Sequence, residues 1–128
     1  VQWALQNETI QVYGDGQQQR CFASVKDIVD AIYRLSISEE AIGQLFNIGN
    51  SEEVTMLQLA ERVRERAGST SDIKLIPYEQ VYASGFEDFR RRVPDISKIA
   101  GVTGWEPLMS LNATIDSIIE YYREQENG

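Results

Sequence analysis

The residues with the clearest chemical potential are arginines placed close to glycines. Residues 12–20 read VYGDGQQQR, a β-branched and aromatic stretch that turns at two glycines and ends on Arg20. Glycine lets a backbone approach a ligand closely, and the flat guanidinium group of arginine matches two oxygens of a phosphate. From this segment alone, a hairpin turn with a solvated arginine is the simpler interpretation. No Gly-Lys-Ser/Thr sequence and no predicted helix follow the glycines, so the segment is neither a Walker A loop nor a dinucleotide fingerprint.

A second basic site is the run of arginines at 90–92, which lies just before Asp95, where we expect a short helix to begin. The first turn of a helix carries a partial positive charge, and arginines beside it strengthen the positive field. Two interpretations are equally well supported. Either an anionic ligand binds here, or Glu87 and Asp88 balance the charge in an exposed loop.

The composition excludes several kinds of chemistry. The chain has 128 residues, no histidine, a single cysteine (Cys21) and a net charge of -8. Without histidine there is no Ser-His-Asp or Cys-His catalysis, and the commonest zinc ligand is missing. The acidic charge argues against non-specific nucleic-acid binding. One cysteine cannot form an internal disulfide and no apolar run is long enough to span a bilayer, so we expect a cytoplasmic protein that does not bind membranes.

The sequence of the first half of the chain predicts short strands that alternate with helices. Ser24 and Asp27 have the spacing of a capping box, with Asp in the usual place of Glu. Apolar periodicity and β-branched runs predict the end of a helix over 1–5, strands over 9–13, 21–25 and 44–48, and a helix over 26–36.

The second half continues this pattern. Thr55 and Gln58 form another capping box, and the helix that they begin ends at Gly68. We expect a fourth strand over 73–76 and an irregular loop over 78–94. Two more helices follow, one from Asp95 to Gly101 and one that begins at Ser110 and carries Leu111, Ile115, Ile118 and Tyr122 on one face.

The predicted elements make one small α/β unit with an incomplete surface. The strands at 21–25 and 44–48 carry apolar side chains on both faces. Strands of this kind are normally covered by helices on both sides, and this chain has few helices. We therefore expect that part of the surface that covers them is missing from the chain.

Four motifs in a fixed order give the chain a family resemblance. They are Val12-Tyr13-Gly14-Asp15-Gly16-x-Gln18-x-Arg20-x-Phe22-x-x-Val25-x-Asp27, Phe46-Asn47-Ile48-Gly49-Asn50, Arg92-x-Pro94-Asp95-Ile96-Ser97-Lys98 and Gly104-Trp105-Glu106-Pro107. From Val1 to about Tyr122 the chain resembles the C-terminal part of extended short-chain dehydrogenases/reductases that act on nucleotide sugars. UDP-glucose 4-epimerase and UDP-glucuronate decarboxylase are the most similar in character.

The resemblance implies a fold, a substrate and a cofactor. Residues 1–128 would be the small C-terminal substrate-binding portion of an extended Rossmann-type α/β epimerase, with residues 20–50 packed onto an absent N-terminal NAD-binding domain. The substrate would be a nucleoside-diphosphate sugar such as a UDP-sugar, and the parent protein would be a homodimer. NAD would be bound by the absent half and recycled during epimerisation, decarboxylation or dehydration.

The resemblance also implies site residues, position by position. Two arginines from separate segments would grip the diphosphate with charge-assisted hydrogen bonds, each worth about 1.5–3 kcal/mol. No glycine fingerprint for NAD and no Tyr-x-x-x-Lys pair occurs, so we expect half of a substrate site, no catalytic residue and no metal. The implied site comprises Gln11, Val12 and Tyr13 beside the nucleobase, Arg20 and Arg92 on the diphosphate, Asp95 near the ribose, and Thr55 close to the substrate.

Two other functions remain open on the sequence. A non-catalytic module that binds nucleotide sugars would keep Arg20 and Arg92 but would never be joined to a catalytic half. An interaction domain would instead pair its exposed strands with another protein. In that case, mutation of both arginines would leave ligand binding unchanged.

Overall fold

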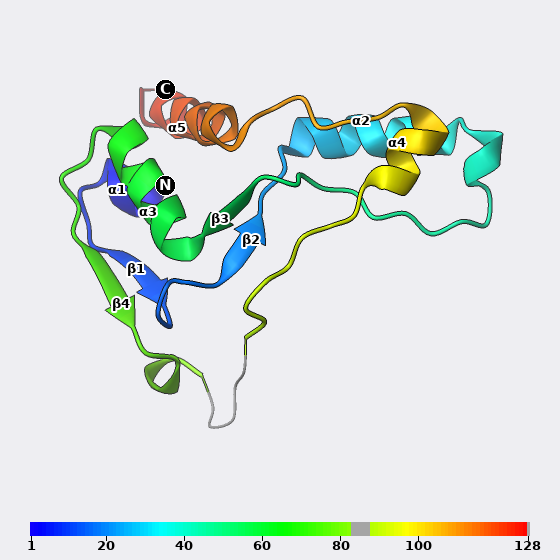
Figure 1. Ribbon diagram of the computed structural model, residues 1–128. Coiled ribbons are helices and arrows are strands. Elements are labelled where there is room, and N and C mark those ends of the chain that lie inside the picture. The colour runs from blue at the N-terminus through cyan, green and yellow to red at the C-terminus, as the bar shows by residue number, and fades with distance from the viewer. Residues whose placement is uncertain (83–87, 128) are drawn as a thin grey trace. The chain divides into compact units, whose positions relative to one another are not determined.

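The computed structural model describes residues 1–82 and 88–127, and they form two structural units (Figure 1). The first unit comprises 1–20, 54–92 and 115–128, and the second comprises 21–53 and 93–114, each within its described residues. Within the described part of the chain, no helix is long and apolar enough to cross a membrane.

The sheet of the first unit is a parallel pair, β1 (Ile10–Tyr13) and β4 (Ile73–Ile76). Figure 1 shows the two strands side by side, and in their register Ile10 lies opposite Ile73 and Tyr13 lies opposite Ile76. Both strands are rich in β-branched residues, which fit the pleated surface of a sheet. The pairing confirms the two strands predicted at 9–13 and 73–76, and it aligns their carboxyl ends at one edge, where the glycine turn begins.

The helix α3 (Met56–Ala67) covers part of this unit, and its ends follow the capping prediction. Thr55 accepts a hydrogen bond from the Gln58 amide, and the Gln58 side chain accepts one from the Thr55 amide. Gly68 ends the helix in the left-handed conformation, at φ 64°. The first unit also contains α1 (Gln2–Leu5), the short 3-10 helix η2 (Tyr78–Gln80) and most of α5 (Leu111–Asn127).

The second unit is built around Trp105, which is fully buried with Ala31 and Ile99. Its indole nitrogen donates a 3.1 Å hydrogen bond to the Asp27 carbonyl, so the polar edge of the ring has a partner. The helices α2 (Val25–Ser36) and α4 (Ser97–Thr103) supply Ala31 and Ile99 to this core. A short 3-10 helix, η1 (Glu39–Ala41), belongs to the same unit.

Two of the predicted strands differ in the structure. The strand predicted at 21–25 is β2 (Gln19–Cys21), which ends before the helix α2 begins at Val25; it pairs with β3 (Glu53–Thr55), which was not predicted. Residues 44–48 form no strand. Phe46 and Ile48 pack onto the Trp105 core, whereas Leu45 is exposed. The alternation of this segment reflects that packing, and no strand among the described residues pairs with it.

Three predicted helix details are also wrong. Ser24 accepts from the Lys26 amide, while the Asp27 carboxylate accepts from the Met109 amide, so the two do not form a reciprocal capping box. The helix α4 passes Gly101 and ends at Thr103, with Gly104 as its left-handed cap. On α5 the buried series is Leu111, Ile115 and Ile119, and Ile118 is exposed.

Candidate functional site

The glycine turn after β1 lies against Tyr78. Gly14 has φ 74°, a conformation that favours glycine. A Cβ at Gly14 would lie 2.6 Å from the ring of Tyr78, so the ring occupies the space that any larger residue would need. The Tyr78 ring can therefore lie this close to the turn only because Gly14 has no side chain.

Arg20 follows the turn and is held by three hydrogen bonds. Its Nη1 donates to the carbonyls of Gln19 (2.7 Å) and Phe89 (2.8 Å), and its Nη2 donates to the Asp88 carboxylate at 2.5 Å. The Arg20 and Asp88 side chains are only 18% and 23% exposed. A guanidinium group has five N–H donors, so the Nε–H and one Nη2–H have no partner among the described residues. Arg20 can therefore still donate to an anion.

The segment at 88–92 runs beside Gln19, so the two arginines of the predicted diphosphate site, Arg20 and Arg92, lie on neighbouring segments of the chain. The Gln19 amide donates to the Arg90 carbonyl (2.8 Å), and the Arg92 amide donates to the Gln19 carbonyl (3.3 Å). The Arg92 guanidinium group lies over the Phe89 ring, 4.5 Å from its centre. In one of the two interpretations of the sequence, Asp88 would help to balance the arginines at 90–92, but in the structure its ion pair is with Arg20. Glu87 lies outside the described residues.

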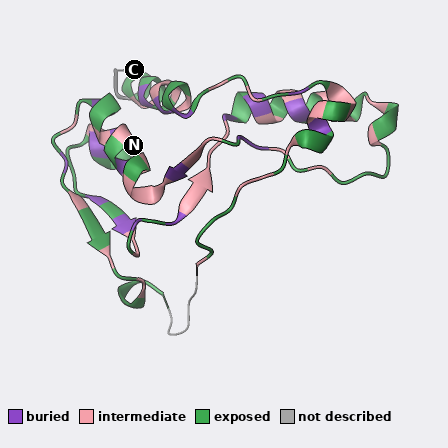
Figure 2. Ribbon diagram, viewed as in Figure 1, coloured by how far each residue is buried: buried purple, intermediate pink, exposed green. Residues whose placement is uncertain are grey.

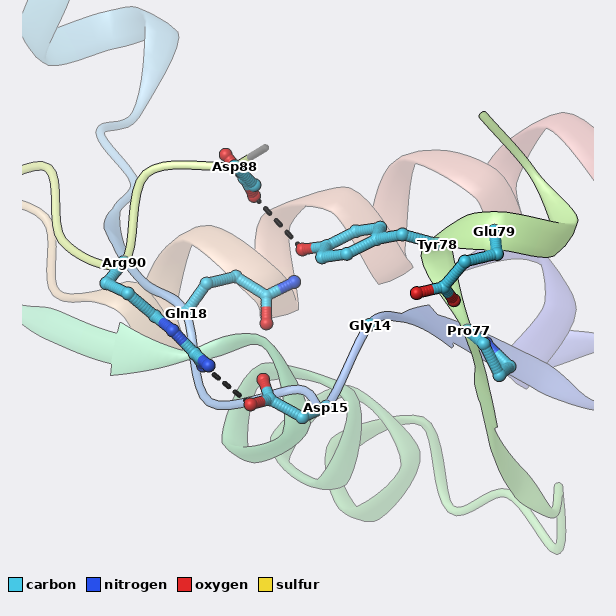
Figure 3. Close-up of a pocket in the computed structure, with 8 residues that line it drawn as sticks. All are labelled: Gly14, Asp15, Gln18, Pro77, Tyr78, Glu79, Asp88 and Arg90. Atoms are coloured by element: carbon cyan, nitrogen blue, oxygen red, sulfur yellow. Dashed lines mark hydrogen bonds and ion pairs between the residues drawn. The ribbon is translucent and has the colours of Figure 1, made fainter. Parts of the chain in front are cut away.

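A pocket of about 490 Å³ opens at the glycine turn (Figure 3). Figure 3 shows Asp15 and Arg90 on one side of it and Tyr78 and Asp88 on another, with the Gln18 amide reaching in between. The Tyr78 hydroxyl donates to Asp88 (3.2 Å), and Arg90 donates to Asp15 (2.6 Å). The pocket is lined by Gly14, Asp15, Gln18, Pro77, Tyr78, Glu79, Asp88 and Arg90.

The charges of this pocket shift two pKa values. Burial, together with the neighbouring Asp88 carboxylate, raises the pKa of the Tyr78 hydroxyl above its ordinary value. The hydrogen bond from Arg90 lowers the pKa of the Asp15 carboxyl below its ordinary value. Tyr78 is therefore a neutral hydroxyl donor and Asp15 an anion at neutral pH. The sequence analysis singled out the glycine turn, the arginine run and Asp88, but it did not predict Pro77, Tyr78 and Glu79 as pocket residues, because the segments that meet here lie far apart in sequence.

The strand β1 presents a free backbone edge beside the same turn. The Ile10 amide donates to the carbonyl of Asp72, just before β4, and the Gly14 amide donates to that of Ile76. The alternating residues Gln11 and Tyr13 therefore direct their backbone groups to the opposite edge. No strand among the described residues pairs with that edge. The Gln18 amide donates to the Tyr13 carbonyl there. The side chain of Val12 is buried in the core of the unit.

Two predicted site residues have structural partners of their own. The Thr55 hydroxyl oxygen caps α3, and the next two amides of the helix, Met56 and Leu57, donate to carbonyls of the glycine turn. The N-terminus of α3 is therefore already satisfied by the chain. Asp95 belongs to the second unit, where its carboxylate accepts from the Ser97 amide. Hydrogen bonding to Ser97 lowers the pKa of Asp95.

The glycine turn differs in geometry from a dinucleotide-binding turn. In a dinucleotide site a glycine turn leads directly into a helix whose N-terminus faces the pyrophosphate. Here the turn at Gly14 and Gly16 leads into the strand β2. Among the described residues, no group of three or more Asp, Glu, Cys or His side chains is placed to hold a metal ion.

Comparison with known proteins shows the family. A family model described as GDP-mannose 4,6 dehydratase matches residues 1–118. The chain is 35% identical over 127 residues to UDP-N-acetyl-alpha-D-glucosaminuronate decarboxylase of Bacillus cytotoxicus, with 99% of this chain and 39% of that protein covered.

Two solved structures have the same fold. The UDP-glucose 4-epimerase of Thermotoga maritima with UDP-glucose has a TM-score of 0.85 and 27% identity, over 97% of this chain and 38% of that one. The UDP-glucuronic acid 4-epimerase of Bacillus cereus, in complex with UDP-glucuronic acid and NAD, has a TM-score of 0.82 and 20% identity, over 96% of this chain and 38% of that one.

The chain thus spans about two fifths of the length of these relatives. The motifs that surround the glycine turn lie within the matched residues 1–118. It follows that this chain belongs to the GDP-mannose 4,6-dehydratase family, among the nucleotide-sugar epimerases, dehydratases and decarboxylases of the extended short-chain dehydrogenases/reductases.

Proposed function

We propose that the chain is the substrate-binding portion of an NAD-dependent enzyme that epimerises, decarboxylates or dehydrates a nucleoside-diphosphate sugar, and that it holds the diphosphate of a UDP-sugar. The observation that carries the proposal is Arg20. Its guanidinium group is largely buried, fixed by three hydrogen bonds, and still has two N–H donors without a partner among the described residues. A fixed fork of donors suits a phosphate group.

Arg92 is the second proposed diphosphate ligand. Its backbone is tied to Gln19, the residue beside Arg20, so the two arginines belong to adjacent segments of one unit. Its guanidinium group rests on an aromatic face and forms no ion pair among the described residues, which leaves its charge available. The pair of arginines would balance the charge of a diphosphate in a protein whose net charge is -8.

The nucleobase would bind along the free edge of β1. The backbone groups of Gln11 and Tyr13 at this edge can hydrogen-bond to a base. Val12, whose backbone groups face β4 and whose side chain is buried, is proposed to hold the strand in place beside the base. Asp95 is proposed as an acceptor for a ribose hydroxyl, since an exposed and ionised carboxylate serves that purpose. Thr55 is proposed to contact the substrate through its hydroxyl hydrogen, because the oxygen caps α3.

The rest of the longer protein would bind NAD and carry the catalytic residues. The helix α2 has an exposed apolar stripe opposite its buried Ala31, at the i, i+4, i+7, i+8 spacing of one helix face. Figure 2 shows that this helix has both exposed and buried positions. We propose that residues 20–50 pack onto the NAD-binding domain through this stripe, and that the parent protein is a cytoplasmic homodimer. The stripe comprises Val25, Val29, Ile32 and Tyr33, which are 73%, 59%, 55% and 63% exposed.

Titration calorimetry of the native, full-length polypeptide with UDP tests the diphosphate site. Arg20→Ala should weaken binding by about 10- to 100-fold, the equivalent of one charge-assisted hydrogen-bonded contact. Arg66→Ala is a matched control, because it also removes an arginine that pairs with an aspartate in the first unit. Equal UDP affinity in wild type and Arg20→Ala would contradict the proposal.

A second measurement separates the enzyme from a non-catalytic binding module. The native reading frame should contain a glycine fingerprint and a Tyr-x-x-x-Lys pair upstream of Val1. The full-length protein should then turn over a UDP-sugar with NAD, whereas the 128-residue chain alone should not. A native protein that lacks both motifs and still binds UDP would be a binding module.

A further inference from the structure

Two ion pairs join the segment at 14–20 to the segment at 88–92, and each segment supplies the arginine of one pair and the aspartate of the other. Arg20 on the first segment pairs with Asp88 on the second, and Arg90 on the second pairs with Asp15 on the first. We propose that Asp88 is a positioning residue for Arg20, holding the guanidinium group in the orientation in which it receives the diphosphate. The inference rests on the proposed function.

Burial is the first reason that Arg20 needs Asp88. The Arg20 side chain is 18% exposed, and a guanidinium group removed from water is costly unless an opposite charge compensates it. Asp88 is the charged group that meets it, at 2.5 Å. The other two acceptors, the carbonyls of Gln19 and Phe89, are neutral. Without Asp88 the arginine would gain by turning toward solvent.

Asp88 is itself held in place. The Tyr78 hydroxyl donates to its second oxygen, while Arg20 binds its first. The Tyr78 ring is in turn packed on Gly14, where a Cβ would lie 2.6 Å away. One chain of contacts therefore runs from the glycine turn through the tyrosine and the carboxylate to the arginine (Figure 3 shows its first three members).

The second ion pair provides an internal control. Asp15 and Arg90 are 51% and 74% exposed at their side chains, and exposed pairs contribute little to stability. The ion-pair partner of Asp15 is Arg90, whereas that of Asp88 is Arg20, and both pairs join the same two segments. Removal of either aspartate takes away one negative charge and one ion pair. In both variants the backbone hydrogen bonds of Gln19 still hold the two segments together.

The test is calorimetry of the full-length polypeptide with UDP, with uridine as the phosphate-free probe. Asp88→Ala should weaken UDP binding by about tenfold, because a freely rotating arginine loses much of its ordered contact. Asp15→Ala should change UDP binding by less than about threefold. Uridine affinity should be the same in wild type and both variants. Asp88→Asn keeps an acceptor for Arg20 and should bind UDP more tightly than Asp88→Ala.

Three results would overturn the positioning role. They are UDP binding by Asp88→Ala that equals or exceeds wild type, equal losses in Asp88→Ala and Asp15→Ala, or an equal loss for uridine. If Asp88→Ala does not fold, Tyr78→Phe is tested instead, because it removes the hydrogen bond to the Asp88 carboxylate without changing the charge. Weaker UDP binding by Tyr78→Phe supports the positioning role, and unchanged binding overturns it. If Arg20→Ala itself leaves UDP affinity unchanged, the proposed function fails as well.

Discussion

Replacement of Gly14 by alanine, which adds a single methyl group, should disturb the glycine turn and the contact of Tyr78 with Asp88. The residue has φ 74°, where an L-residue is strained, and the added Cβ would lie 2.6 Å from two ring carbons of Tyr78 and 2.9 Å from its hydroxyl oxygen. The ring cannot remain where it is at such distances. Its displacement breaks the hydrogen bond from Tyr78 to Asp88.

The size of the effect follows from two contributions. The left-handed backbone costs an alanine about 1–2 kcal/mol. Loss of a hydrogen bond to a charged carboxylate adds about 1.5–3 kcal/mol. Gly14→Ala should therefore lower the free energy of unfolding by about 2.5–5 kcal/mol, of which only the first part is backbone strain.

A matched glycine separates the two contributions. Gly68 has φ 64°, and nothing lies within 4 Å of a Cβ built on it, so Gly68→Ala measures backbone strain alone. Urea unfolding followed by circular dichroism should give a larger loss for Gly14→Ala than for Gly68→Ala. A double variant that also carries Tyr78→Ala should remove the steric part of the difference. Equal losses in the two alanine variants would refute the reasoning, because the Tyr78 ring would then impose no constraint on the turn.

Three further predictions concern packing and charge. Trp105→Ala should destabilise the protein by about 3–5 kcal/mol in urea, because the indole is fully buried and hydrogen-bonded; a loss below about 1 kcal/mol would contradict its place in the core. The hydrogen bond from Arg66 lowers the pKa of Asp116, so the ionised Asp116 adds to the free energy of unfolding above the ordinary carboxyl pKa, and this contribution is lost as pH falls through the lowered value. Asp116→Asn should therefore reduce the decline in stability on acidification, and an unchanged pH profile would count against the ion pair. The isolated 128-residue chain should self-associate in light scattering through the exposed stripe of α2, and Ile32→Lys should reduce its apparent mass; a chain that is monomeric without the substitution would contradict this.

Local signals predicted the elements that are defined locally. Thr55 and Gln58 mark the start of α3 and Gly68 marks its end, and all three have the roles that their types predict. The strands β1 and β4 were likewise predicted from β-branched runs, although their parallel pairing joins residues more than 60 positions apart. The segment at 44–48 was mistaken for a strand because it is a short apolar run closed by a glycine. An irregular segment that packs Phe46 and Ile48 onto a core has the same sequence pattern.

The site was predicted only in part, and for a physical reason. The motif around Arg20 and the run of arginines are contiguous in sequence, so their chemistry is visible in the sequence itself. The pairing of Arg20 with Asp88 and the packing of Tyr78 on Gly14 join residues more than 60 positions apart. Nothing in local sequence specifies such contacts, since they depend on how β1, β4 and the segment at 88–92 meet.

The most direct test of the central claim is a crystal structure of the native, full-length polypeptide with UDP. The account predicts phosphate oxygens at about 2.7–2.9 Å from the Arg20 guanidinium nitrogens, with Asp88 still bound to the same side chain. The base should lie along the free edge of β1. UDP bound elsewhere, with Arg20 in contact with Asp88 alone, would contradict the assignment of this chain as the diphosphate-binding portion.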